Sequence, residues 1–271
     1  MKRIASLSAI PALLALLASA CGGGGETEPA EDTTPGTLTI LVNGEDFVQN
    51  GFVSKDGWSI SFRHLWVTLD NIEAHQTDPP FDPHTDSGIS PFETAGLAGP
   101  ITLDLVSPEG PVTAGTIEVV PPGHYNAISW DVVPAASGPS EGYSIFIDGQ
   151  AEKGDQSYQV YLGFEQGLRF LGGEYVGDER LGFVEPGGES ELEITFHMDH
   201  LFGDGSLPED DPLNAAALGF EPFASLMQEG TVSADLEDLG AALGEDFRGD
   251  LMGILKTLGH TGEGHCLCIV L

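Results

Sequence analysis

The sequence has few basic residues, few cysteines and few recognisable catalytic motifs. It contains 9 Lys and Arg residues against 43 Asp and Glu residues, which gives a formal net charge of −34. A surface with this charge repels DNA, RNA and anionic lipid headgroups, which excludes nucleic acid as a partner. Solubility or adaptation to salt explains the charge more simply than a specific acidic function does.

Signatures of common metalloenzymes are also missing. The chain has no H-E-x-x-H sequence and no C-x-x-C pair, which argues against zincin-type proteases and finger-type zinc sites. Carboxylates are so numerous that no pair of them stands out for glycoside hydrolysis. We therefore expect a protein that is not an enzyme, with a metal-assisted hydrolase as a remote alternative.

Long hydrophobic runs are absent except at the start of the chain. Lys2 and Arg3 precede an apolar stretch, residues 4–20, that is shorter than a typical membrane span. This stretch ends in the small residues Ala18-Ser19-Ala20, directly before Cys21. Residues 1–20 are therefore predicted to be a secretory signal peptide.

Cys21 and the glycines after it resemble a bacterial lipobox, in which the cysteine that follows the cleavage site is acylated. Lipidation of Cys21 is therefore expected, with the membrane as a partner through this anchor. Gly22 stands where inner-membrane lipoproteins carry Asp, which favours the outer membrane, facing the periplasm or the outside. Ala18-Ser19-Ala20 also fits an ordinary cleavage site, so the alternative is a soluble periplasmic protein. Residues 21–36, rich in Gly, Glu, Thr and Pro, are typical of a flexible tether.

The sequence after the tether alternates short apolar strands with Gly and Pro turns. Apolar residues alternate with polar ones from Leu38 to Val42, and a longer strand is predicted from Trp58 to Leu69. This spacing predicts a mainly β fold, a β-sandwich of the immunoglobulin type or a related one, over residues 37–202. Further strands are expected at residues 101–105, 116–120, 124–133, 143–147, 157–164, 168–171, 181–184 and 191–198.

The pattern becomes helical after Phe202. Short helices opened by proline are predicted at residues 212–218 and 222–229. Longer ones are predicted from Ser233, as the N-cap, to Leu243, and over residues 246–258. Their apolar stripes are narrow, so residues 203–271 are expected to form a helical extension that packs on the sandwich and ends in a tail of His and Cys residues.

Two segments rich in histidine are the clearest candidates for a site. His197 and His200 lie at the end of the last strand of the sandwich, and they converge only if the chain bends after Met198. His260 and His265 lie in a loop whose glycines would let it wrap tightly around a ligand. Imidazole and thiolate are borderline-to-soft donors, so a cluster of these histidines would suit Zn or Cu.

The tail also offers sulfur donors. Cys266 is a further candidate ligand, and Asp199 is a candidate partner that orients the ligating histidines. Cys266 and Cys268 are too close in sequence for an easy disulfide, so they pair between chains, form a strained bridge or bind a soft ligand. The order of donors differs from a blue-copper loop, where Cys precedes His and Met, which argues against electron transfer. Histidines also cap turns and satisfy backbone groups, so a purely structural role is the alternative for all four.

A second polar cluster lies in a proline-rich loop. Its histidines and carboxylates would suit a divalent ion, but the prolines stiffen the loop without forcing the side chains together, so a solvated loop is the simpler expectation. The members of this second cluster are His75, Asp78, Asp82, His84 and Asp86.

Three stretches of the sequence form a distinctive set: Gly57-Trp58-Ser59-Ile60-Ser61-Phe62, Phe196-His197-Met198-Asp199-His200-Leu201-Phe202, and Leu258-Gly259-His260 with Gly262-Glu263-Gly264-His265-Cys266. Together they resemble an uncharacterised family of bacterial outer-membrane lipoproteins that is common in myxobacteria. The resemblance covers most of the chain after Cys21, and it implies an exported lipoprotein in which the histidine segments are not accidental; no activity comes with it. The region from Asp104 to Trp130 is also similar in fold pattern to β-sandwich lipoproteins that include copper-associated periplasmic proteins.

Members of this family often carry an EF-hand-like loop before the last helices. Here Gly230-Thr231-Val232-Ser233, followed by Leu236, takes the second half of such a loop. Ser225, Met227 and Leu236 stand where oxygen ligands are required, so no calcium is expected at this turn.

The sequence thus predicts a non-enzymatic outer-membrane lipoprotein that binds Cu or Zn through His197, His200, His260 and His265. The alternative is a metal-free module of the cell envelope or surface, for adhesion, glycan binding or envelope assembly. Which protein or glycan would then be its partner is left open by the sequence.

Overall fold

The computed structural model describes residues 32–271, and Thr33–Leu271 belong to one unit of the fold. The predicted signal peptide and Cys21 lie outside the described residues. Two β-sheets hold most of the regular secondary structure, so the mainly β sandwich predicted from the sequence is confirmed. Among residues 32–271, no helix is long and apolar enough to cross a membrane.

The smaller sheet has five strands in the order β16-β15-β13-β1-β6. β1 and β13 run parallel, with Asn43 beside Thr195, whereas the other neighbouring strands are antiparallel. Buried and half-buried residues alternate regularly along β1, as the period of two in its sequence predicts. The strands are β1 (Gly36–Asn43), β6 (Val112–Val120), β13 (Glu189–Phe196), β15 (Gly259–Thr261) and β16 (Gly264–His265).

The larger sheet has ten strands, along the path β14-β10-β9-β3-β8-β11-β17, with β2, β4 and β5 paired to β3 off this path. β3 extends well beyond Leu69, where the predicted strand ended. A register shift between Phe62 and His64 marks a bulge that changes the parity of the strand, so Ile60 and Leu65 are both buried in one core. The strands are β2 (Phe52–Val53), β3 (Ser59–Gln76), β4 (Glu93–Leu97), β5 (Ile101–Asp104), β8 (Ala127–Val132), β9 (Ile145–Lys153), β10 (Gln156–Phe164), β11 (Leu168–Gly172), β14 (Thr231–Ala234) and β17 (Leu267–Val270), while β7 (Gly123–His124) and β12 (Phe183–Val184) form a separate pair.

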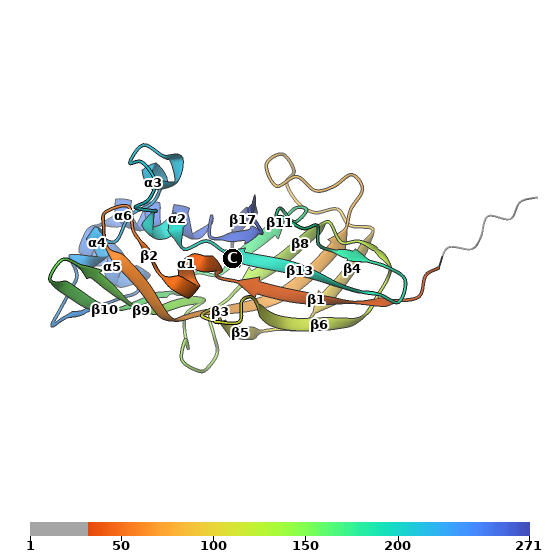
Figure 1. Cartoon of the computed structure of the whole chain (residues 1–271), viewed down its shortest axis with the longest axis horizontal. Helices are drawn as coiled ribbons and strands as arrows, with labels where there is room; N and C mark the ends of the chain where they lie inside the picture. Colours follow the sequence, from red (N-terminus) through yellow and green to blue (C-terminus); the bar gives the residue numbers. More distant parts are fainter. Residues whose placement is uncertain (1–31) are drawn as a thin grey trace, which may run out of the picture. The chain divides into compact units, whose positions relative to one another are not determined.

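The two sheets face each other across one hydrophobic core. In Figure 1 strands β1, β6 and β13 lie across β3 and β8, and β6 contacts both β4 and β5 of the larger sheet. Leu38 and Ile40 of the smaller sheet share the core with Val67, Trp130 and Phe170 of the larger one, and all five are fully buried. Each such side chain stabilises the fold by about 1.5–3 kcal/mol relative to an exposed one.

Among the helices after the last long strand, α4, α5 and α6 lie at the β9-β10 end of the larger sheet, whereas α3 stands away from it (Figure 1). Trp58, which precedes β3, contacts Tyr158 of β10 and Phe220, with ring centroids 5.2 Å apart in both cases. The helices are α1 (Glu45–Asn50), α2 (Asp199–Phe202), α3 (Pro212–Ala216), α4 (Glu221–Ala224), α5 (Leu236–Leu243) and α6 (Glu245–Leu255).

Two local predictions for this region were wrong. Ser233 does not cap a helix, because residues 231–234 form β14 beside β10, and Asp235 caps α5 instead by accepting a hydrogen bond from the backbone N–H of Asp238. The tail predicted as a glycine-rich loop forms the hairpin of β15 and β16. The C-terminal part of the chain therefore adds strands to both sheets, besides the helices that the sequence predicted.

Candidate metal centre

Four histidines from the two histidine-rich segments meet at one end of the smaller sheet. The ring centroids of His197 and His260 lie 4.1 Å apart, and those of His260 and His265 lie 4.6 Å apart. By the same measure, His200 lies 5.0 Å from His260 and 6.0 Å from His265. The structure therefore brings together all four histidines that the sequence singled out.

Strand pairing places the tail beside the end of β13. Thr195 and His260 are partners across β13 and β15, and the backbone N–H of His197 donates to the carbonyl oxygen of Leu258 at 3.0 Å. His260 in turn lies opposite His265 across the β15-β16 hairpin. These pairings fix three of the four histidines relative to one another through backbone hydrogen bonds alone.

The fourth histidine is brought in by a bend directly after β13. Met198 adopts a helical conformation, with φ −75° and ψ −17°, and α2 begins at the next residue. This turn carries His200 back toward His197, so that their ring centroids lie 5.6 Å apart. A continued strand would have sent the two side chains to opposite faces.

Glycines permit the tight return of the tail. Gly262 has a φ of +60°, and a Cβ at this position would lie 2.1 Å from the carbonyl oxygen of Val176. A Cβ at Gly259 would lie 2.8 Å from the ring of Phe170. The glycines that mark this segment in the sequence are therefore required by the backbone, which must approach its neighbours closely.

The hydrogen bonds of the two most buried histidines of the cluster leave one nitrogen of each ring with a lone pair. Nε2 of His260 lies 3.0 Å from the carbonyl oxygen of Thr257, which only accepts, so Nε2 carries the proton. Within residues 32–271 no hydrogen-bond partner reaches Nδ1 of His260, although this residue is only 2% exposed. Nε2 of His197 likewise donates to the carbonyl oxygen of Gly262 at 3.2 Å. Metal-ligating histidines characteristically donate their second N–H to such an oxygen.

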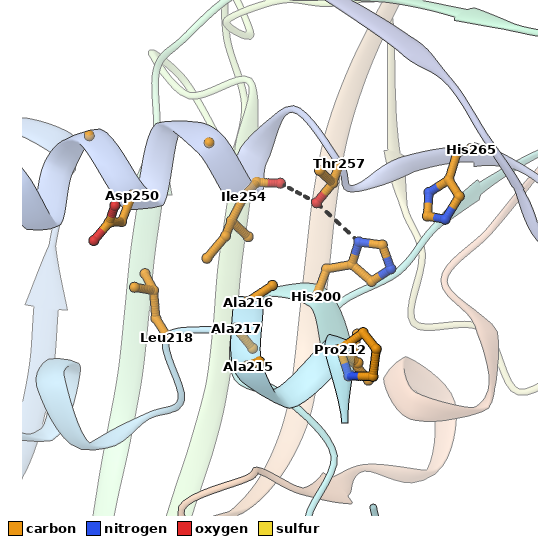
Figure 2. Close-up of a pocket in the computed structure, with 13 residues that line it drawn as sticks. His200, Pro212, Ala215, Ala216, Ala217, Leu218, Asp250, Ile254, Thr257 and His265 are labelled. Atoms are coloured by element: carbon orange, nitrogen blue, oxygen red, sulfur yellow. Dashed lines mark hydrogen bonds between the residues drawn. The ribbon is translucent and has the colours of Figure 1, made fainter. Parts of the chain in front are cut away.

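Thr257 also orients His200. Its hydroxyl donates to the carbonyl oxygen of Ile254 at 2.8 Å, so the hydroxyl oxygen accepts the N–H at Nδ1 of His200 at 3.0 Å (Figure 2). Nε2 of His200 then carries the lone pair. Thr257, which follows α6, therefore orients two of the four imidazoles. Its side chain orients His200, and its backbone carbonyl orients His260.

Two carboxylates lie against His197. Oε2 of Glu45 lies 3.4 Å and Oδ1 of Asp199 lies 3.9 Å from Nδ1 of His197. Because Nε2 already donates elsewhere, these oxygens face a nitrogen lone pair, which is unfavourable unless a proton or a metal cation lies between them. His197, Asp199 and His200 each offer a donor atom within 4.8 Å of the others, and Glu45, His197 and Glu263 form a second such group.

Burial keeps two of the imidazoles neutral. Desolvation, reinforced by the neighbouring histidines, lowers the pKa of His200 to about 4 and that of His260 to about 3. Neutral imidazole is the form that binds a metal, so both are available as ligands at neutral pH. Burial also raises the pKa of Glu45 to about 7, although His197 opposes this shift, and it raises the pKa of Asp199 in the same way. A cation at this position would favour the charged form of both carboxylates.

Cys266 directly follows His265, but its thiol lies near a backbone carbonyl and the hydrophobic core. Its Sγ is 4.0 Å from the carbonyl oxygen of Gly264, and the side chain packs against the hydrophobic core. Burial raises the pKa of this thiol far above its usual range, which disfavours the thiolate that a metal requires. Cys268 is also a free thiol, and burial raises its pKa too.

The second polar cluster is divided between two places. His75 is buried at the end of β3, where its ring nitrogens lie 3.0 Å from the hydroxyls of Thr94 and Ser129. His84 approaches the histidine cluster instead, with its ring centroid 6.3 Å from that of His265. This approach was not expected from the sequence, in which nothing links the proline-rich loop to the tail.

Sequence reasoning missed three other residues of the site. Glu263 stands in the tail motif itself and has a recognisable signal there, whereas Glu45 and Thr257 have none, because tertiary pairing alone brings them to the histidines.

The sequence also contains the spacing of a nucleophile elbow, Gly138-Pro139-Ser140-Glu141-Gly142. It lies between β8 and β9, and not at a strand-to-helix turn, and Ser140 is 1% exposed, so it offers no accessible nucleophile.

Two cavities adjoin the histidine cluster. The apolar cavity, of about 810 Å³, lies between α3 and α6 and has His200 and His265 in its wall (Figure 2). The acidic cavity, of about 610 Å³, includes Glu45 and Glu263 of the cluster. The other carboxylates that line it belong to Asp178, Glu179, Glu191 and Glu193. The cluster therefore adjoins a cation-attracting cavity and an apolar one.

Comparison with protein-family models, with curated proteins and with solved structures finds no match for this chain. The resemblance to outer-membrane lipoproteins therefore stays a prediction from the sequence. What the structure adds is a group of His, Asp and Glu side chains, with His197 and Asp199 buried, that could hold a metal ion.

Proposed function

We propose that this protein binds a transition metal, Cu or Zn, at the cluster of His197, His200 and His260, with Asp199 beside them and His265 at the exposed edge. The observation that carries the proposal is Nδ1 of His260, a buried lone pair among other imidazoles that no group of residues 32–271 satisfies. A buried polar atom without a partner costs about 1–3 kcal/mol, and a bound metal would remove this cost.

The chemistry of the donors supports Cu or Zn over harder ions. Imidazole nitrogens dominate the cluster, and they suit Zn and Cu, whereas Mg and Ca require mainly oxygen ligands. Three imidazoles and one carboxylate match the number of ligands in a tetrahedral zinc site. The donor atoms of His197, Asp199 and His200 lie within 4.8 Å of one another. The acidic cavity supplies an entry path for the cation.

We also propose that the chain is exported and anchored to the outer membrane through Cys21, as its first residues predict. Mass spectrometry of the mature N-terminus tests this part independently of the metal. An acylated Cys21 is expected, whereas an unmodified Cys21 would indicate a soluble periplasmic protein.

Metal analysis of protein purified without a histidine tag tests the metal site. After loading with Cu or Zn and desalting, one equivalent is expected in the wild type and far less in a His197→Ala, His265→Ala double variant. A His64→Ala, His124→Ala double variant is the matched control, because both residues lie outside the cluster. Circular dichroism shows whether each variant is folded. A wild type that retains no metal would favour the metal-free envelope module, for adhesion, glycan binding or envelope assembly.

A further inference from the structure

The apolar cavity is open because small residues form its walls. Ala215, Ala216 and Ala217 line it from the α3 side, and Gly249 and Gly253 line it from α6. Beyond its chain neighbours and the backbone of its own helix, a Cβ built at either glycine would meet no atom of residues 32–271 within 4 Å, so larger side chains there would project into free space. Its volume of about 810 Å³ falls in the range of small-molecule sites.

The two ends of the apolar cavity differ in polarity. His200 and His265 line it toward the histidine cluster, while Asp250 lies toward the opposite end (Figure 2). Ile254 and Leu218 lie between these ends and give the middle an apolar surface. A molecule that fills the cavity therefore meets the metal site at one end, hydrocarbon in the middle and a carboxylate at the other end.

We infer that the apolar cavity binds a small molecule with an unbranched apolar body, an uncharged tail and an oxygen-donor head that coordinates the metal. The inference rests on the proposed metal site. His265 is the exposed member of the cluster and borders the cavity, so the side of the metal toward the cavity is where a ligand can approach. A tail with a negative charge is disfavoured, because it would lie next to Asp250.

Two hydroxamates that share a head and differ in their tails provide the test. Octanohydroxamic acid and acetohydroxamic acid bind zinc through the same pair of oxygens, so their difference in affinity measures the apolar body alone. With zinc-loaded protein whose metal content has been measured, calorimetry is expected to show at least a tenfold tighter binding of octanohydroxamic acid, because each buried methylene favours binding.

Filling the cavity should remove this difference. Gly253→Leu, and separately Ala216→Leu on the opposite wall, are expected to bring the affinity for octanohydroxamic acid down to that for acetohydroxamic acid, without loss of zinc. Ala242→Leu, on the exposed surface of α5, is the matched control and should keep the difference. Two wall variants ensure that a folding defect in one does not decide the result.

The outcomes separate the two proposals. Equal affinities for the two hydroxamates in zinc-loaded wild type overturn the cavity inference and leave the metal site standing. A protein that holds neither zinc nor copper overturns both. Suberic acid monohydroxamate, which carries a carboxylate at the end of its tail, should bind more weakly than octanohydroxamic acid. Asp250→Asn should reduce this difference in affinity. Equal affinities of the two compounds for the wild type would contradict the proposed orientation of the ligand, with its tail toward Asp250.

Discussion

Glu45 and His197 lie within 3.4 Å of each other because two parallel strands end side by side. Asn43 and Thr195 are partners in β1 and β13, and each of the two contacting residues follows its strand partner by two positions. A half-buried carboxylate that follows β1 is thereby placed beside a buried imidazole that follows β13. The charge state of this contact should affect the stability of the metal-free protein, which can be measured as the free energy of unfolding at different pH values.

Glu45→Gln should stabilise the metal-free protein at alkaline pH. Burial raises the pKa of Glu45 from 4.5 to about 7, so the stabilisation that its neutral form provides is complete below pH 4.5 and is lost as the pH rises through 7. The neutral glutamine avoids that loss, and the free energy of unfolding at pH 8 is expected to rise by about 1–3 kcal/mol. Urea denaturation in the presence of a chelator measures it.

The gain from Glu45→Gln should nearly vanish at pH 4, where wild type is protonated as well. Glu191→Gln, at an exposed position of β13, is the control and should change the stability little at either pH. An equal gain at both pH values would show that packing, and not charge, is responsible.

His260 should make the metal-free protein sensitive to acid. Its pKa is lowered by burial from 6.5 to about 3, so the folded state resists a proton that the unfolded chain accepts. Its contribution is complete above pH 6.5 and is lost as the pH falls toward 3. Between pH 7 and pH 5, wild type is expected to lose about 2 kcal/mol more unfolding free energy than His260→Gln does.

Denaturation curves at the two pH values give this difference directly. Glu45 and Asp199 oppose it, because their raised pKa values favour folding in acid, but both remain in the variant and largely cancel. Parallel pH profiles of wild type and His260→Gln would contradict the prediction.

The sequence predicted the fold class because its evidence is local. Alternation along β1 and the apolar run of β3 report burial directly, and the glycines around His260 and His265 reported a tight return of the tail. The prediction of Ser233 as a helix cap is wrong because a strand of four residues, such as β14, is recognisable only when β10 lies beside it.

The candidate site was predictable only in part. Histidines at the end of a strand and in a glycine-rich tail stand out by residue type, but Glu45 and Thr257 belong to the cluster only through long-range pairing. The role expected for Asp199 also changes. Among residues 32–271 no hydrogen-bond partner reaches its Oδ1, so Asp199 is a candidate ligand as well as an orienting group.

Thr257→Val should weaken metal binding without removing a ligand. The valine keeps the backbone carbonyl that holds His260 but removes the hydroxyl that accepts the N–H of His200. Loss of such an orienting group typically lowers metal affinity about 10–100-fold. Competition with a chromophoric chelator measures the affinity. Thr94→Val, which removes a hydroxyl from His75 outside the cluster, is the control and should leave the affinity unchanged.

Cys266→Ser should leave metal binding intact. The thiol packs against the core with its Sγ toward the carbonyl oxygen of Gly264, and its raised pKa disfavours the thiolate. The same competition assay should therefore give the wild-type affinity, while the melting temperature falls slightly, since a polar hydroxyl replaces a buried sulfur. A loss of affinity beyond tenfold would place Cys266 among the ligands after all.

Neutralising the acidic cavity should slow the arrival of the metal and not its departure. Asp178 and Glu179 line this cavity, outside the groups of donor atoms described above, so they act on a cation through the field that they create. Stopped-flow mixing with Zn²⁺ at an ionic strength of about 0.01 M, where the Debye length is about 30 Å, should show a slower association for Asp178→Asn, Glu179→Gln than for wild type. Added salt should reduce the difference, because it screens the carboxylates that remain in wild type.

The control is the double variant Glu209→Gln, Asp210→Asn, which removes the same charge from an exposed loop between α2 and α3 and is expected to leave the association rate nearly unchanged. If both double variants slowed association equally, the net charge of the protein, and not this cavity, would guide the cation, whereas a faster dissociation in Asp178→Asn, Glu179→Gln would mean that these carboxylates hold the metal themselves.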